Sequence, residues 1–373
     1  MSMTPRERIL AVYRGEVPDV VPFMLDLSHW FYHKHRMPWD LSQSFEEPEH
    51  DLIDYHKRVG AGFYMPNLGA FYSAGYPDDV QATVSKSADG REISWAFETP
   101  LGAVRRTRRW EEQTYAWGIA EWGIRTEADL KALGYALSRR TFSARWDRYR
   151  AWAENVGEHG VVYLPFGYSA MGHLLHYWLG IEGTVYATID WHDTLREVVD
   201  RINANGLECI DLLAQSPADV IIMGDNFSSD IQSPHFFHEW SCPFYTEAIR
   251  RLHAAGKYVA VHIDGRLRGS LDMFRGLDAD CADAVTPVPM GDLDPEQCRQ
   301  EAGPHLILSG GVAPNLWLPE ADVADFTKAV LRWLDLKEHG PRLIANAGDQ
   351  VPPGASEDRI LLMRDLVEEH GRY

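Results

Sequence analysis

Eight short apolar runs alternate with longer amphipathic stretches, and this alternation constrains the fold more than any other feature of the chain. The runs are rich in β-branched residues and end at Asp, Gly or Pro. Strands that alternate with helices are typical of a parallel sheet, and eight is the number that a closed (β/α)8 barrel requires. The predicted strands are Val20–Asp26, Ala61–Pro66, Val161–Gly167, Asp219–Asp225, Tyr258–Asp264, Asp283–Val288, His305–Gly311 and Arg342–Gly348. We therefore predict an α/β protein of the TIM barrel type, with one domain over residues 1–373.

Two segments fall outside the alternation. Gln81–Trp110 contains an Asp-Gly turn between β-like runs, which predicts antiparallel hairpins inserted after the second strand. Such an insertion either walls the mouth of an active site or serves as a structural or dimerising flap. Thr4, Pro5 and Glu7 indicate an extra N-terminal helix, which we expect to pack on the barrel. Within the alternation, a longer helix is predicted over 233–254, beginning at a Ser-Pro pair.

Composition excludes several classes of protein. A chain of 373 residues with 45% hydrophobic residues can bury a large core. Its net charge of −19 argues against a nucleic-acid or anionic-membrane partner, since both require a basic surface. No run reaches the length of a membrane span, and the first residues lack the apolar core of a signal peptide, so we expect a cytoplasmic location. The four cysteines form no C-x-x-C motif and are expected to be buried free thiols.

Polar side chains mark the ends of two predicted strands. His262 and Asp264 are two positions apart at the end of the fifth strand, so both side chains point to the same face. Asp349 directly follows the eighth strand. Because α/β enzymes keep their chemistry at the carboxyl ends of their strands, these three residues predict a polar, metal-capable floor for the barrel.

Other candidate residues lie near the ends of the third and fourth strands. Asp225 is expected to act as a catalytic group, a ligand or a substrate anchor, with a turn or helix-cap role as the alternative. Asn226, beside it, is expected to bind substrate. Tyr168 can donate a hydrogen bond to a substrate oxygen, or else form an aromatic wall. His173 and His176 have a metal-capable i, i+3 spacing, although ordinary packing is the favoured interpretation.

The end of the first strand contributes a further group. Barrel closure would place Asp26 and His29 beside Asp349, where a catalytic relay or a substrate contact is one interpretation and a helix cap the other. Trp30 and Tyr72 belong to a set of aromatic residues that follow predicted strands. These rings are expected either to line an apolar pocket for an aromatic ligand or to form part of the core or an interface.

Stretches spread over nearly the whole chain resemble the uroporphyrinogen decarboxylase superfamily. They are Thr4–Arg8, Arg14–Pro22, Gly224–Asn226, Ser233–Phe237, His253–Lys257 with His262, Leu308–Gly311 and Asn346–Gly354. The resemblance implies a single (β/α)8 barrel, often a homodimer, with its site at the C-terminal mouth. The superfamily contains both cofactor-free porphyrinogen decarboxylases and zinc-dependent methyltransferases of corrinoid systems, so the resemblance alone leaves the reaction open.

The chain departs from the decarboxylase pattern at two places. Decarboxylases of this superfamily carry an arginine-rich segment after their first strand, which gathers the carboxylates of the tetrapyrrole. Here Met24–Tyr32 contains a lone Asp26 among aromatic residues, which cannot pair with a polyanion. The late Leu-Gly-His-Gly motif is also absent, and Asp349 stands in the position of its histidine.

The methyltransferase branch matches in part. Its members hold zinc with a His-x-Cys motif on the fifth strand and a Cys after the eighth, and these positions are His262, Asp264 and Asp349 in this chain. The resemblance implies a divalent metal, most simply zinc, on an oxygen-rich ligand set that favours an oxygen donor over a thiol. Such a metal could polarise a methyl-ether oxygen of a small substrate. Because no segment resembles a cobalamin-binding domain, a separate corrinoid protein is the expected methyl partner.

Other interpretations of the same residues stay open. His262, Asp264 and Asp349 could form a metal-free acid/base cluster, in which neighbouring carboxylates raise one another's pKa. That interpretation corresponds to a decarboxylase without a cofactor. A purely structural hydrogen-bonded cluster is a further alternative, and a barrel that binds a ligand without catalysis is a third function.

Overall fold

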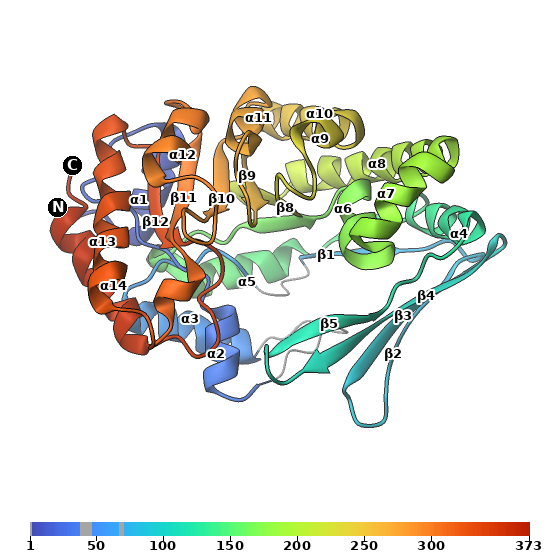
Figure 1. The fold of residues 1–373 in the computed structure, drawn as a ribbon, viewed down its shortest axis with the longest axis horizontal. Coiled ribbons are helices and arrows are strands. Elements are labelled where there is room, and N and C mark those ends of the chain that lie inside the picture. Colours follow the sequence, from blue (N-terminus) through green and yellow to red (C-terminus); the bar gives the residue numbers. More distant parts are fainter. Residues whose placement is uncertain (1, 38–46, 67–70) are drawn as a thin grey trace.

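A six-stranded parallel sheet forms the centre of the protein. The computed structural model describes residues 2–37, 47–66 and 71–373 (Figure 1). The strands of this sheet lie in the order β12-β11-β10-β9-β8-β7. They are β7 (Leu164–Gly167), β8 (Val220–Phe227), β9 (Tyr258–Ile263), β10 (Cys281–Val285), β11 (Ile307–Val312) and β12 (Leu343–Ala347). These six strands coincide with the last six predicted ones, so the mixed α/β fold is confirmed.

The first two predicted strands are not regular strands in the structure. Instead of ladders, single parallel bridges join Phe23 to Ala345 of β12 and Met24 to Gly62. A further bridge joins Phe63 to Gly160, just ahead of β7. The two segments therefore lie between the outer strands β12 and β7 but pair with them only locally. A regular eight-stranded closed barrel stays a prediction.

Helices connect the strands and cover the sheet (Figure 1). The α-helices are α1 (Pro5–Arg14), α2 (Ser28–Lys34), α3 (Glu47–Val59), α4 (Glu127–Leu137), α5 (Trp146–Val156), α6 (Ala170–His173), α7 (Gly180–Asp190), α8 (His192–Ala214), α9 (Pro234–Trp240), α10 (Cys242–Ala254), α11 (Ser270–Gly276), α12 (Pro295–Ala302), α13 (Val323–Leu334) and α14 (Glu357–His370). Shorter helical segments are η1 (Gly157–His159), η2 (Leu174–Trp178), η3 (Pro314–Trp317) and η4 (Asp335–His339). Of these, η2 is a π-helical turn, a type that is frequent at functional sites.

The single helix predicted over 233–254 is wrong, because the structure has two helices there. Ser233 caps α9 as expected, and its side chain accepts a hydrogen bond from the backbone of Phe236. The break falls at Ser241, between α9 and α10. Pro243 lies in the first turn of α10, where its missing N–H is tolerated, but the same proline could not continue α9 without losing a helical hydrogen bond.

The N-terminal helix α1 packs against one face of the parallel sheet. Thr4 and Glu7 form the predicted capping box, and the Tyr13 hydroxyl donates to the Tyr163 hydroxyl at 2.9 Å. Ile9 and Tyr13 belong to one buried cluster with alternate residues of the parallel strands, including Val220 of β8. Alternate residues of a strand share a face, so α1 covers the apolar face that those residues form.

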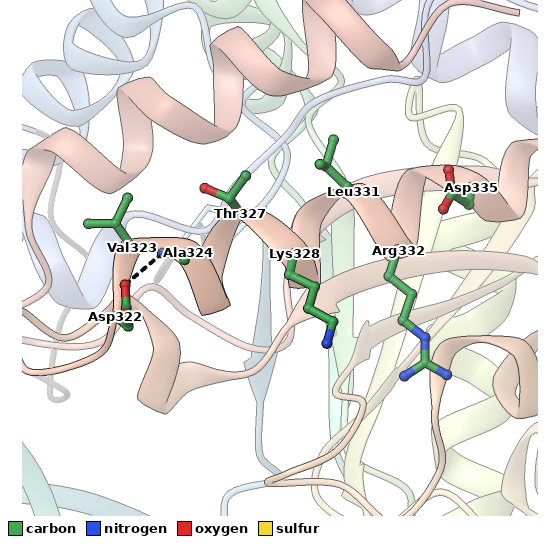
Figure 2. Close-up of a pocket in the computed structure, with 8 residues that line it drawn as sticks. All are labelled: Asp322, Val323, Ala324, Thr327, Lys328, Leu331, Arg332 and Asp335. Atoms are coloured by element: carbon green, nitrogen blue, oxygen red, sulfur yellow. Dashed lines mark hydrogen bonds between the residues drawn. The ribbon is translucent and has the colours of Figure 1, made fainter.

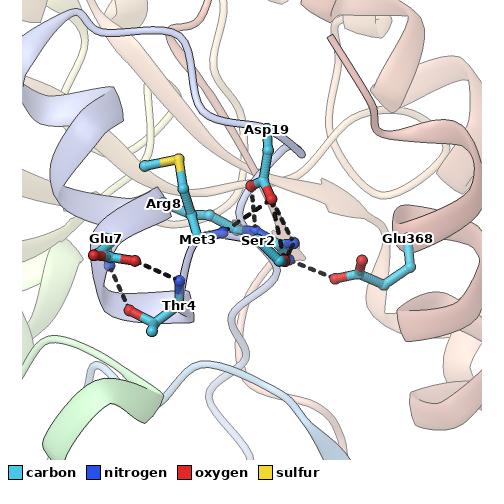
Figure 3. A network of polar contacts seen from close by, with 7 residues as sticks. All are labelled: Ser2, Met3, Thr4, Glu7, Arg8, Asp19 and Glu368. Carbon is cyan, nitrogen blue, oxygen red and sulfur yellow. Dashed lines mark hydrogen bonds and ion pairs between the residues drawn. The ribbon is translucent and has the colours of Figure 1, made fainter.

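A polar network fastens α1 to the C-terminal helix α14 (Figure 3). The Arg8 guanidinium pairs with Asp19 through Nε to Oδ1 at 2.7 Å and also with Glu368 of α14. Asp19 further accepts a hydrogen bond from the backbone N–H of Met3 at 3.1 Å. Because the Arg8 side chain is largely buried, both carboxylates are needed to compensate its desolvation.

A separate antiparallel sheet occupies the position of the predicted insertion. Its strands are β2 (Gln81–Lys86), β3 (Glu92–Thr99), β4 (Gly102–Glu111) and β5 (Ala116–Glu121), in that order. It extends eleven residues beyond the predicted end at Trp110, because β4 pairs with a further strand, β5. Two short strands, β1 (Tyr72–Gly75) and β6 (Thr141–Ala144), pair with each other in a separate antiparallel sheet. Figure 1 shows β2–β5 away from α13 and α14, with β5 nearest to α2.

No helix in the described part of the chain is long and apolar enough to span a membrane.

Candidate functional site

A histidine and three aspartates meet at the carboxyl ends of the parallel strands. His262 lies in β9, and its Nδ1 is 3.1 Å from the Oδ2 of Asp283, a fully buried residue of the neighbouring strand β10. On the other side of the ring, Nε2 is 4.0 Å from Oδ1 of Asp349, which follows β12. The charge of Asp264 acts on both His262 and Asp349. Of the three predicted metal ligands, His262 and Asp349 therefore lie close together, and Asp264 is near enough for its charge to act on both.

The charges of this site shift the titration of its members. Burial alone would lower the pKa of His262, but the hydrogen bond and charge of Asp283, with Asp349 and Asp264, raise it to about 9. Burial and the charge of Asp264 raise the pKa of Asp349 to about 7, although His262 acts in the opposite direction. The cluster can therefore exchange a proton near neutral pH, which is a common property of catalytic sites.

Two strand irregularities lie next to the site. The pairing of β10 with β11 shifts register between Ala282 and Val285, and Ala284 within that interval has a φ of 65°. The pairing of β8 with β9 shifts between Gly224 and Phe227, and Asn226 there has a φ of 44°. A positive φ is costly for alanine, and bulges of this kind redirect side chains next to active sites. The first irregular segment contains Asp283, and the second contains Asp225 and Asn226.

Asp26 joins the same group from the first predicted strand. Its carboxylate accepts hydrogen bonds from the backbone N–H and the hydroxyl of Ser28, at 2.9 and 2.6 Å, at the start of α2. Burial, together with the charge of Asp283, raises the pKa of Asp26 above its ordinary range. The charge of Asp26 in turn acts on Asp349, as expected if the first strand lies beside the eighth. Asp26 thus has both a helix-cap contact and a place next to the site.

Asp225 is enclosed rather than open to a ligand. It is fully buried and accepts hydrogen bonds from the Ser169 backbone N–H at 2.7 Å and from its hydroxyl at 2.5 Å. Tyr245 also hydrogen-bonds its side chain. Ser169 is the N-cap residue of α6, so Asp225 holds the start of that helix. A Cβ on Gly172 would come 2.3 Å from Oδ1 of Asp225, which explains a glycine in this turn.

Tyr168 and Asn226 form a polar pair beside the cluster. The Tyr168 hydroxyl donates to Oδ1 of Asn226 at 3.1 Å, and both side chains are partly exposed. Since the Asn226 oxygen receives this bond, its NH2 group is left to donate elsewhere. The ring of Tyr168 lies 4.9 Å from that of Tyr177 in an edge arrangement. Through the NH2 group of Asn226, the pair can therefore offer a hydrogen-bond donor to a substrate oxygen.

The remaining three predicted residues have protein partners. Trp30 is buried and donates from its indole Nε1 to the carbonyl of Ala355 at 2.8 Å. A ring nitrogen of His29 contacts the carbonyl of Tyr115 at 2.9 Å, on the loop between β4 and β5. The Tyr72 hydroxyl donates to the carbonyl of Phe166 at 2.7 Å. Their substrate-binding role stays a prediction.

Asp283 is the site residue that the sequence did not reveal. The sequence offered one signal, a carboxylate within the otherwise apolar run Cys281–Val285. Asp283 also accepts a hydrogen bond from the Ser309 hydroxyl at 3.1 Å, so its two oxygens serve different partners. A carboxylate on the far nitrogen of a histidine is the usual support for a histidine that binds a metal.

The donor set fits a divalent cation in its chemistry. One imidazole nitrogen and the carboxylates of Asp264 and Asp349 are competent ligands, and Asp283 orients the imidazole. In the described residues, no three His, Cys, Asp or Glu side chains are already gathered as a metal site. The 4.0 Å between Nε2 of His262 and Asp349 exceeds the roughly 3.3 Å that separates two ligand atoms of one zinc ion.

A surface hollow of about 810 Å³ lies elsewhere, along α13 (Figure 2). One helix and its ends supply its whole lining, including Val323, Lys328 and Arg332. None of the predicted site residues lines it, so we do not connect it with the site at the strand ends.

The fold and the site together define an α/β protein with an acidic, histidine-containing cluster at the ends of its parallel strands. The chain belongs to the uroporphyrinogen decarboxylase (URO-D) family, whose model matches residues 173–370. The match includes His262, Asp264, Asp283 and Asp349.

Comparison with solved structures supports the fold. A methyltransferase from Methanosarcina mazei superposes with a TM-score of 0.62 over 99% of both chains, at 14% sequence identity. At that identity the likeness concerns the fold alone. The match to a citrate synthase, SbnG, covers 44% of this chain and 70% of the SbnG chain, at 13% sequence identity. Its TM-score of 0.26 is too low to indicate a shared fold. No curated protein matches the sequence.

Proposed function

We propose that this protein is a metal-dependent, methyltransferase-like enzyme of the uroporphyrinogen decarboxylase family. Its substrate would be a small oxygenated compound such as a methyl ether, and a corrinoid protein would be its methyl partner. Family membership and the likeness to a solved methyltransferase support this choice. A closed (β/α)8 barrel, a homodimer and a cytoplasmic location belong to the same proposal.

The observation that carries the proposal is the arrangement around His262. Its Nδ1 is engaged by the buried Asp283, so Nε2 is the nitrogen that faces Asp349. A histidine oriented in this way, beside further carboxylates, is typical of metal sites with an open ligand position. The oxygen-rich set suits a divalent cation of intermediate to hard character, with zinc as the first choice.

A bound divalent cation would supply Lewis acidity toward an ether oxygen. The chain's own groups would do the rest of the work. Asn226, whose amide oxygen is held by the Tyr168 hydroxyl, could donate a hydrogen bond that fixes the substrate oxygen near His262. Asp26, which is outside the ligand set, could hold or accept a proton, because burial raises the pKa of its carboxyl group.

A second candidate is a metal-free decarboxylase, and one observation favours it. With a pKa raised to about 7, Asp349 is partly protonated at neutral pH and could deliver a proton to a carbanion-like intermediate. His262, with a pKa raised to about 9, would then be a cation that attracts the substrate carboxylate. In that case the site would require no cofactor.

A paired assay separates the two candidates. The unmodified protein is incubated with 2-methoxyphenol or 4-methoxybenzoate and free cob(I)alamin, with and without zinc, and methylcobalamin formation is followed by absorbance. Carbon dioxide release from carboxyl-labelled 4-methoxybenzoate is measured in parallel. We expect zinc-dependent methyl transfer that a chelator abolishes. Carbon dioxide release that a chelator does not affect, without methyl transfer, would reject the proposal in favour of the decarboxylase.

A further inference from the structure

Two arginines of the inserted sheet lie against η2 and have no acidic partner among the described residues. Arg106 and Arg108 are two positions apart on β4, and both guanidinium groups lie over the ring of Tyr177. Arg106 is buried, with an exposed fraction of 9%, and Arg108 is partly exposed. Neither takes part in an ion pair with the described residues, although the chain has 55 acidic and 36 basic side chains. A buried cation without a counterion is unusual in such an acidic protein.

Aromatic rings hold the two guanidinium groups in place. The central carbon of the Arg106 guanidinium lies 4.1 Å from the ring centre of Trp95 and 4.7 Å from that of Tyr177. Arg108 lies 4.8 Å from the ring centre of the same Tyr177. Stacking of this kind fixes a guanidinium plane but satisfies none of its N–H groups.

The donor groups of this cluster are left without partners. In the described part of the structure, Nε and Nη1 of Arg106 and Nε of Arg108 are buried and make no hydrogen bond. Nε2 of His176 and Nδ1 of His173 are buried and unpartnered as well. Burial, and then the charge of Arg108, lower the pKa of Arg106 to about 9, so its charged form is destabilised where it lies. An anion would satisfy the donors and remove this penalty.

The cluster is contiguous with the candidate site. Nη2 of Arg108 donates to the carbonyl of His176 in η2, at 3.4 Å. The ring of His176 lies 5.6 Å from that of Tyr168, which hydrogen-bonds Asn226. His176 also interacts with the backbone of Asp225 and with the charge of Asp264. The two arginines are therefore connected through η2 to the acidic residues of the candidate site.

We propose that Arg106 and Arg108 form a subsite for an oxyanion, a carboxylate or a phosphate, carried by the substrate. The inserted sheet would then be a recognition element rather than a flap without contact to substrate. Positive charge on β4 and the carboxylates of Asp264 and Asp349 would orient an anionic substrate, with its anion toward the sheet and its reacting group toward the strand ends. Only this orientation rests on the proposed function, because the anion subsite is defined by the arginines themselves.

Anion binding to the full chain tests the subsite. Sodium benzoate, its neutral isostere benzamide and inorganic phosphate are titrated by calorimetry into the unmodified protein and into the Arg106→Gln, Arg106→Lys and Arg108→Gln variants. The matched control is Arg109→Gln, which removes the same charge from the next position of β4, where Arg109 is exposed and pairs with Glu92. Thermal melting in the same buffers reports folding and any stabilisation by the anion.

We expect an oxyanion to bind the unmodified protein and the control alike, and at least about tenfold more weakly to Arg106→Gln and Arg108→Gln. Benzoate binding without phosphate binding would assign a carboxylate, and the reverse a phosphate, whereas benzamide should not bind. If neither anion binds, or if all variants bind equally, the subsite is overturned. Anion binding is measured without metal or turnover, so a failed methyl-transfer assay would not overturn the anion subsite. Failure of anion binding would likewise not overturn the proposed methyl transfer. Should Arg106→Gln fold poorly, Arg108→Gln alone decides.

Discussion

The His262→Gln variant is expected to bind zinc ~100-fold or more weakly than the unmodified protein. Losing a group that only supports a ligand typically costs 10–100-fold in metal affinity, so loss of the ligand itself should cost at least the upper end of that range. The change also leaves the buried carboxylate of Asp283 without its imidazole partner. Affinity is measured by competition with a chromophoric chelator at fixed pH.

A second histidine of the chain provides the matched control for this variant. His253 pairs with Asp280 through Nε2 at 2.8 Å, away from the site, so His253→Gln also removes an imidazole from a histidine–aspartate pair. Its zinc affinity should equal that of the unmodified protein. Equal affinity in His262→Gln as well would show that His262 is not a ligand.

The pH dependence of zinc binding follows from the same histidine. Because the pKa of His262 is raised to about 9, the proton competes with the metal over the whole neutral range. Affinity should therefore rise with pH up to about 9 in the unmodified protein. In His262→Gln this component of the rise should be absent.

The Asp225→Ala variant is expected to lose about 3–5 kcal/mol of its free energy of unfolding at pH 7. The substitution removes the acceptor for the Ser169 N–H, the Ser169 hydroxyl and Tyr245, all of which lie in the interior. It also removes the group that holds the start of α6. Urea unfolding followed by circular dichroism measures the loss, and a change below about 1 kcal/mol would contradict this role.

The Asp225→Asn variant isolates the charge of the same carboxyl group. Burial raises the pKa of Asp225 to about 6, above the roughly 3.9 of an unfolded chain. Its contribution to stability is therefore full below pH 4 and is lost as the pH rises through 6, by about 3 kcal/mol. Asparagine cannot ionise, so the stability of Asp225→Asn relative to the unmodified protein should improve by that amount between pH 4 and pH 8. A pH-independent difference would show that the ionised carboxylate is not penalised.

The order of the predicted strands was sufficient to predict that His262 and Asp349 lie close together. Asp349 lies beside His262 because parallel strands end at the same edge of a sheet, and Asp264 directly follows the end of β9 at Ile263. Asp26 approaches Asp349 for the same reason, since the first segment bridges β12. These relations depend only on where the strands end and on their order in the sheet. The apolar runs of the sequence predict both.

Long-range pairing and local irregularity explain what the sequence did not reveal. Asp283 comes to His262 because the two residues lie opposite each other where β10 pairs with β9, a register that one strand's sequence does not specify. Arg106 was not singled out because its significance depends on the rings of Trp95 and Tyr177, of which Tyr177 lies 71 positions further along the chain. The enclosure of Asp225 by Ser169 likewise depends on contacts between distant segments.

Elemental analysis of the untagged protein, purified without chelators, tests the central claim most directly. We predict about one equivalent of zinc or another divalent metal per chain, retained through gel filtration. A protein that contains no metal, and takes none up when zinc is added at pH 8, would contradict the metal-dependent account and direct attention to decarboxylation.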